Sequence, residues 1–99
     1  MSKYYIWKDK EAIPIVDVIE WATWFEKNER RVGFTEIRDV EVSTVFLGLD
    51  HSFGVIEEPL IFETMVFGGP LDQDQEHYST WDQAEEGHKR MVEKVRQAI

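Results

Sequence analysis

The sequence contains no cysteine, which excludes disulfide bonds, thiolate metal sites, iron–sulfur clusters and cysteine nucleophiles. It also contains no run approaching the ~20 apolar residues that a membrane span requires. Charged and aromatic side chains alternate within Met1 to Lys10, so this segment has no apolar signal region. These absences predict a cytoplasmic protein that neither spans nor enters a membrane.

Basic residues are also scarce, with 11 Lys and Arg against 20 Asp and Glu and a formal net charge of −9. Such a chain repels a phosphate backbone on average, so binding of ordinary DNA or RNA is disfavoured. Two interpretations remain. The acidic surface keeps a small protein soluble, or it forms an acidic face for a basic partner, including a mimic of nucleic acid.

What the sequence does contain is a good supply of large apolar side chains. Of its 99 residues, 42% are hydrophobic, including four Trp, three Tyr and six Phe. This length and composition predict one domain over residues 1–99 that folds without covalent staples. The broad Trp21 and Trp24 stripe exceeds what a small chain readily covers, and it predicts a homodimer.

The hydrophobic periodicity predicts an α+β fold with the element order β-α-β-β-β-α. We expect an antiparallel sheet of three or four strands with two helices packed on it. The segments Lys8 to Pro14 and Leu71 to His77 are polar and are expected as a turn and an acidic loop. The expected strands are Tyr4–Trp7, Arg31–Arg38, Val40–Leu49 and Leu60–Phe67, and the expected helices start at Ile15 and at Thr80.

Two of these strands stand out because they become apolar on both faces. Val40–Leu49 and Leu60–Phe67 are therefore expected to pair antiparallel in the middle of the sheet. The first helix carries its apolar stripe on Ile15, Val18, Ile19, Ala22 and Phe25. The last helix has a capping-box spacing and a stripe on Trp81, Ala84, His88, Met91, Val92 and Val95.

Four ionisable residues are candidates for a site by their positions. Glu63 shares a strand face with apolar residues, His88 lies within the apolar stripe of the last helix, and Asp50 and His51 directly follow the most buried strand. We predict that Glu63 contacts His88. In the alternative interpretation, His88 is a satisfied core histidine, Glu63 pairs with an arginine, and Asp50 caps a turn.

Local positive charge provides a second candidate. Arg30, Arg31, Arg38 and Lys89 would form a site for a nucleotide-like signal if they converged beside an aromatic ring such as Trp7 or Trp81. Solvated surface charge is the alternative. No cofactor is expected, because Gly68-Gly69 lacks the lysine and spacing of a phosphate-binding loop.

Several blocks of the sequence resemble a known family. They are STVFLGLDHSFG from Ser43, LIFETMVFGG from Leu60, and YSTW from Tyr78 with Ala84, Gly87 and His88 downstream. WATWFE from Trp21 and Arg30-Arg31-Val32 also match. Together they resemble a family of small bacteriophage and prophage proteins without an assigned activity. The resemblance implies a viral accessory protein, or one encoded near morphogenesis genes, that acts inside a bacterial host.

Three functional hypotheses follow. The first is a non-catalytic protein that binds a host protein or a small host signal molecule, as in counter-defence. The second is a metal-assisted hydrolase in which Asp50, His51, Glu63 and His88 converge on a divalent ion; no metal site is assigned from their spacing alone. The third is a structural virion or assembly component.

Overall fold

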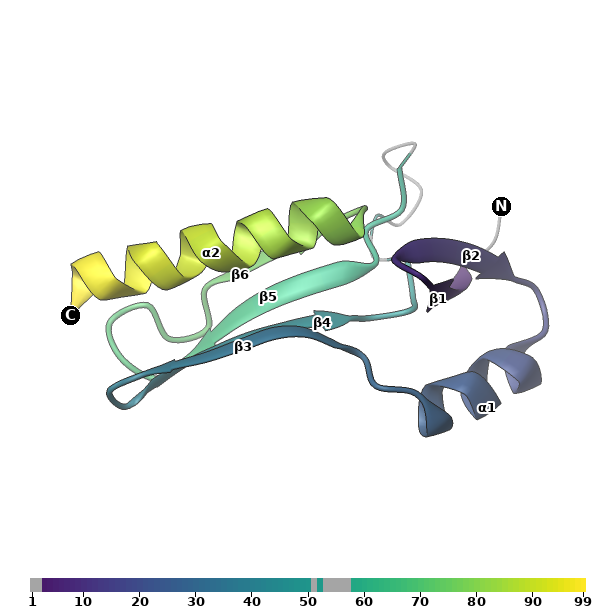
Figure 1. Cartoon of the computed structure of the whole chain (residues 1–99), viewed down its shortest axis with the longest axis horizontal. Helices are drawn as coiled ribbons and strands as arrows, with labels where there is room; N and C mark the ends of the chain where they lie inside the picture. Colours follow the sequence, from purple (N-terminus) through teal and green to yellow (C-terminus); the bar gives the residue numbers. More distant parts are fainter. Residues whose placement is uncertain (1–2, 51, 53–57) are drawn as a thin grey trace.

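The computed structural model describes residues 3–50, 52 and 58–99, and it confirms the α+β class. A two-stranded hairpin and one helix precede a four-stranded antiparallel meander, and a long helix ends the chain (Figure 1). The elements are β1 (Tyr4–Lys8), β2 (Glu11–Ile15), α1 (Val18–Lys27), β3 (Arg31–Ile37), β4 (Val40–Phe46), β5 (Phe62–Phe67), β6 (Gln75–Tyr78) and α2 (Trp81–Ala98).

The larger sheet has the order β3-β4-β5-β6, so β4 and β5 are its central strands. They pair antiparallel, with Val42 opposite Val66 and Thr44 opposite Thr64. The expected pairing of Val40–Leu49 with Leu60–Phe67 is therefore confirmed. Side chains on β4 alternate strictly between buried and partly exposed, because successive residues of a strand point to opposite faces of the sheet.

Helix α2 lies along one face of this sheet (Figure 1). Its start is fixed by the predicted capping box, in which Thr80 accepts from the Gln83 backbone N–H and the Gln83 side chain returns to the Thr80 backbone. The expected stripe is confirmed on Ala84, Met91, Val92 and Val95, which are buried together with Gly87. Three of them pack with Val40, Val42 and Val66 in one core cluster.

A second core cluster joins the N-terminal elements to the end of the sheet. Phe46 and Phe62 are its buried aromatic residues. Trp7 of β1 and Trp24 of α1 pack against them. Trp21 is used internally as well, because its indole N–H donates to the Tyr5 carbonyl at 3.1 Å. The tryptophans that suggested an uncovered stripe therefore contact the chain's own residues.

The expected start of the first helix is wrong. Ile15 ends strand β2, and α1 begins after Asp17, whose side chain accepts from the Ile19 backbone N–H at 2.9 Å. The expected stripe also fails near this end, where Val18 and Ile19 are 47% and 74% exposed. Ala22 is exposed as well, and the helix packs mainly through Trp21, Trp24 and Phe25, of which Phe25 belongs to the expected stripe.

Two short edge strands, β2 and β6, were not expected from the sequence. Strand β2 follows a tight turn in which Asp9 and Lys10 both have positive φ, which allows two residues to join the strands. Strand β6 lies at the edge of the larger sheet and has the polar sequence QEHY. Short, polar edge strands carry little hydrophobic alternation, so the pattern resembles that of a loop.

Candidate interaction surface

One face of the four-stranded sheet is covered and the other is not. Both core clusters lie on the side of α2, and α1 lies beyond the end of the sheet (Figure 1). Within the described residues, no helix or second sheet packs on the opposite side. We call this side the open face; it consists of Arg31, Phe34, Glu36, Glu41, Ser43, Val45, Glu63, Met65, Phe67, Gln75 and His77.

Large apolar side chains on the open face reach solvent. Phe34 on β3 is 43% exposed and Phe67 on β5 is 46% exposed. Val45 and Met65 lie on the two central strands of the same face and are partly buried. Apolar side chains that stay exposed on a sheet face contribute little to folding, and such a patch is typical of a surface that another molecule covers.

The same face carries an unfavourable pair of carboxylates. Glu36 on β3 lies directly opposite Glu41 on β4, and Glu41 lies opposite Phe67 on β5. Within the part of the chain that the structure describes, neither carboxylate has an ion-pair partner. Like charges directly opposite each other in a sheet destabilise it by a few tenths of a kcal/mol to about 1 kcal/mol. The open face thus combines apolar side chains with unneutralised negative charge.

Glu63 also lies on the open face, and its predicted contact with His88 is wrong. Its Oε2 atom lies 2.9 Å from Nε2 of His77, which is directly opposite on β6. His88 lies under α2, on the covered side of the sheet. The alternation of β5 places Glu63 on one side and its neighbours Phe62 and Thr64 on the other. The two predicted partners are therefore separated by the sheet.

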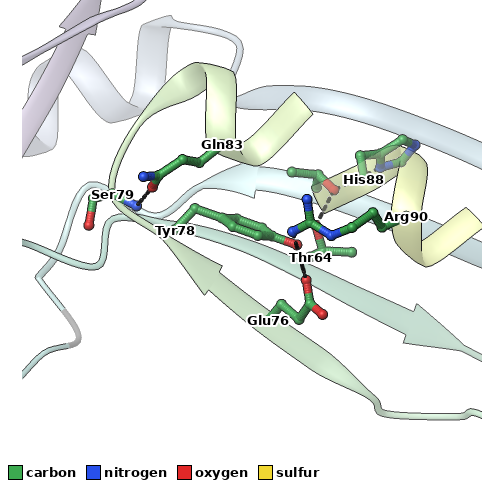
Figure 2. Close-up of polar contacts among 8 residues, drawn as sticks. Thr64, Glu76, Tyr78, Ser79, Gln83, His88 and Arg90 are labelled. Atoms are coloured by element: carbon green, nitrogen blue, oxygen red, sulfur yellow. Dashed lines mark hydrogen bonds and ion pairs between the residues drawn. The ribbon is translucent and has the colours of Figure 1, made fainter. Parts of the chain in front are cut away.

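His88 instead joins hydroxyl groups of two strands in a chain of hydrogen bonds between α2 and the sheet. Its Nδ1 lies 2.7 Å from Thr44 Oγ1 and its Nε2 lies 2.9 Å from Thr35 Oγ1. Thr44 in turn bonds Thr64 at 2.5 Å (Figure 2). The ring lies flat against Gly33, where any Cβ atom would approach it to 3.1 Å. The alternative interpretation of a satisfied core histidine is the correct one.

The hydroxyl chain continues past Thr64 to Tyr78 and Glu76. Tyr78 donates to Glu76 Oε1 at 2.8 Å, and Arg90 on α2 lies 3.6 Å from the same carboxylate oxygen (Figure 2). Burial raises the pKa of Tyr78 to about 12, and the hydrogen bond to Thr64 opposes this rise. At neutral pH the phenol therefore stays protonated and serves as a structural donor.

Burial lowers the pKa of His88 from its ordinary value of 6.5, so the unfolded chain takes up a proton here more readily than the folded chain. We expect the stability contributed by a neutral His88 to be complete above about pH 6.5 and to decline as the pH falls below it. Urea unfolding at about pH 7.5 and about pH 5.5 tests this, with His88→Gln as the comparison. A variant with the same pH dependence as the parent would contradict it.

The predicted cluster of basic residues does not form. The Arg30 guanidinium lies over the Phe25 ring at 4.4 Å, and that of Arg31 lies over Phe34 at 4.7 Å. Arg38 occupies the turn between β3 and β4 with positive φ, roughly 20 Å along β3 from Arg31 at the ordinary strand rise. Lys89 is exposed on α2. These cations are distributed over the surface and do not converge on Trp7 or Trp81.

A different cation lies beside Trp81. Trp81 stacks on Trp7 with ring centroids 4.4 Å apart, and the Lys10 ammonium lies 5.8 Å from the Trp81 ring. Lys10 and Trp81 line a shallow cleft of about 300 Å³, together with the acidic Glu11. Lys10 was not among the candidates predicted from the sequence. Asp9-Lys10 lies in a short polar segment typical of a tight turn, and this turn places Lys10 beside Trp81. One lysine offset by a carboxylate gives little affinity for a phosphate group.

The hypothesis of a divalent metal site is not supported by the described residues. Asp50 caps a turn, as the alternative interpretation expected: its Oδ1 accepts from the backbone N–H groups of Ser52 at 2.8 Å and Leu60 at 3.0 Å. Glu63 and His88 lie on opposite sides of the sheet, and His51 lies outside the described residues. Among the residues that are described, no group of three or more His, Asp or Glu side chains could hold a metal ion.

Comparison with known proteins adds no assignment. No protein family, curated protein or solved structure matches the chain. Within the described part of the chain, no helix combines the length and apolar character needed to cross a lipid bilayer.

Proposed function

We propose that this chain is a non-catalytic binding protein that docks a basic protein partner on its open face. The observation that carries the proposal is the combination of exposed Phe34 and Phe67 with the unpaired carboxylates Glu36 and Glu41 on an uncovered sheet. Apolar side chains supply the buried centre of an interface, and a cationic partner relieves the repulsion between the two carboxylates.

The partner chemistry follows from the charge of the chain and of this face. A net charge of −9 raises the encounter rate with basic proteins at moderate ionic strength. On the open face, Arg31 lies over the Phe34 ring and His77 pairs with Glu63. Among the described residues, neither of them neutralises the negative charge of Glu36 and Glu41. The resemblance to bacteriophage and prophage proteins supports a host protein in the bacterial cytoplasm as the partner, as in counter-defence.

A small nucleotide-like signal is the weaker candidate. It would use the cleft beside Lys10 and Trp81, where an aromatic ring and one ammonium group are present. Glu11 in the same cleft and Asp82 in the first turn of α2 oppose a phosphate group there. The open face has two exposed phenylalanine rings and a charge pattern that a protein surface complements.

The test replaces Phe67 by a photoreactive phenylalanine analogue and cross-links the protein in infected host cells. We expect one dominant cross-linked protein with a basic surface, and its yield should fall at least about tenfold when Glu36→Lys and Glu41→Lys are introduced together, since both attractive contacts become repulsive. Mass spectrometry identifies the partner and decides whether it is a host protein or a viral assembly component.

The matched control carries the same change in charge on the other side of the molecule. Glu86 and Glu93 are exposed on α2, away from the open face. Glu86→Lys with Glu93→Lys should leave the cross-linked yield within about twofold of the parent. Equal losses in the two double variants would show that overall charge, and not the open face, decides binding, and the proposal would then be wrong.

A further inference from the structure

Among the described strands, none pairs with the outer edge of β3, which is one long edge of the larger sheet. It contains seven residues, whereas β6 at the opposite edge contains four. Unpaired edge strands present backbone N–H and C=O groups that readily accept another strand. A bulge between Arg31 and Gly33 interrupts the register at one end, so the regular part of the edge is the stretch from Gly33 to Ile37.

The hairpin geometry determines which backbone groups face outward. Ile37 and Val40 flank a two-residue turn and form the first hydrogen-bonded pair of the β3–β4 ladder. Hydrogen-bonded and non-hydrogen-bonded pairs then alternate, so Phe34 and Glu36 belong to the non-hydrogen-bonded kind. Their N–H and C=O groups point away from β4, and no other described element bonds them. The free edge therefore offers the backbone N–H and C=O groups of Phe34 and Glu36 to another strand.

The side chains on this edge are complementary to those of a second, antiparallel copy of the same strand. Arg31, Phe34 and Glu36 follow one another on the open face, with Phe34 between a positive and a negative residue. Within the described residues, neither the Arg31 guanidinium nor the Glu36 carboxylate has an ion-pair partner. An antiparallel second copy centred on Phe34 places the Arg31 of each chain near the Glu36 of the other. Opposite charges across paired strands are stabilising.

We propose that two copies of this chain pair through the free edges of β3, antiparallel and centred near Phe34. The two four-stranded sheets then form one continuous sheet, and a two-fold axis perpendicular to it keeps both open faces on the same side. The dimer thereby brings the two open faces side by side, with Phe67 and Glu41 of each copy left to contact a partner while Glu36 pairs with Arg31 of the other copy. This arrangement differs from the tryptophan-mediated dimer that the sequence suggested, and it does not depend on the proposed basic partner.

Charge reversal tests the pairing on the purified chain alone, by sedimentation equilibrium over a concentration series. We expect a dimer for the parent, and we expect Arg31→Glu or Glu36→Arg alone to weaken it by about tenfold or more, because two symmetric contacts become repulsive. The double variant R31E/E36R restores opposite charges and should recover affinity to within about threefold. A monomeric parent, or no recovery in the double variant, would overturn the proposal.

A proline variant tests the backbone contact separately. The Glu36 N–H points outward, so Glu36→Pro removes a donor from the edge without removing a β3–β4 hydrogen bond. Glu36→Ala is the control, since it removes the same charge and keeps the N–H. We expect Glu36→Pro to be monomeric with a melting temperature close to that of Glu36→Ala, which should still dimerise weakly. Equal dimerisation of the two variants would exclude edge pairing. Because the basic protein partner is absent from this experiment, that result would leave the proposed function unaffected.

Discussion

Replacing Phe46 by alanine is expected to lower the free energy of unfolding by about 3–5 kcal/mol, the range for deleting a fully buried phenylalanine ring. Phe46 is fully buried at the end of β4. Its ring centroid lies 5.2 Å from that of Phe62, 5.8 Å from that of Trp24 and 6.3 Å from that of Trp7. The ring is therefore where β1, α1 and the larger sheet meet. Its loss leaves a cavity that all three elements line.

The matched control is Phe67→Ala on the neighbouring strand, because Phe67 is 46% exposed on the open face. We expect this change to cost about 1–1.5 kcal/mol, since only about half of the side chain is buried to begin with. Urea unfolding followed by tryptophan fluorescence measures both variants. A Phe46→Ala variant that loses no more stability than Phe67→Ala would mean that the N-terminal elements do not pack on the sheet as described.

The elements with strong periodicity were predictable. Helix α2 has an apolar stripe and a capping box, and β4 and β5 are consecutive strands that carry apolar residues on both sides, which predicts their pairing at the centre of the sheet. Helix α1 was predicted with the wrong start because apolar residues continue from β2 into the helix with Asp17 as the one polar residue between them. Only the capping role of Asp17 marks the boundary, and one aspartate is a weak signal beside a continuous apolar run.

The candidate site was predicted less well, for a reason inherent to central strands. Residues of β5 are apolar on both sides, so the sequence does not indicate which side α2 covers. The prediction placed Glu63 on the helix side, whereas Thr64 and Phe62 occupy it. Thr44 and Thr64 are fully buried, and threonine is equally common on exposed strand faces. The polar network around His88 could therefore not be predicted without knowing which side of the sheet α2 covers.

The open face could not be predicted from the sequence for the same reason. Phe34, Glu36 and Glu41 lie on neighbouring strands, and the register brings the two carboxylates opposite each other. The pattern of one strand gives no information on which residue of the next strand lies opposite, because a shift of one residue reverses the side of every side chain. The acidic composition left open an acidic face for a basic partner, and the structure adds where the negative charge of Glu36 and Glu41 coincides with apolar side chains.

Adding one methyl group at Gly87 is expected to destabilise the protein by about 2–4 kcal/mol, as overpacking of a tight core does. Glycine to alanine within a helix ordinarily stabilises by about 1 kcal/mol, so the expected sign is reversed. Gly87 is buried in α2 directly over the Tyr78 ring, and a Cβ atom there would overlap the ring atoms Cζ, Cε1 and Oη. Tyr78 cannot easily withdraw, because its hydroxyl group is bonded to Glu76 and its ring is buried.

A double-mutant cycle separates this overlap from a general effect of the helix. In a Tyr78→Phe background, Gly87→Ala should keep most of its penalty, because Cζ and Cε1 of the ring remain in place. In a Tyr78→Ala background the ring is absent, and Gly87→Ala should become neutral or stabilise by up to about 1 kcal/mol. Urea unfolding of the six proteins measures the coupling. The same penalty in all three backgrounds would show that Gly87 is required by something other than Tyr78, and the packing of α2 on β6 would need another explanation.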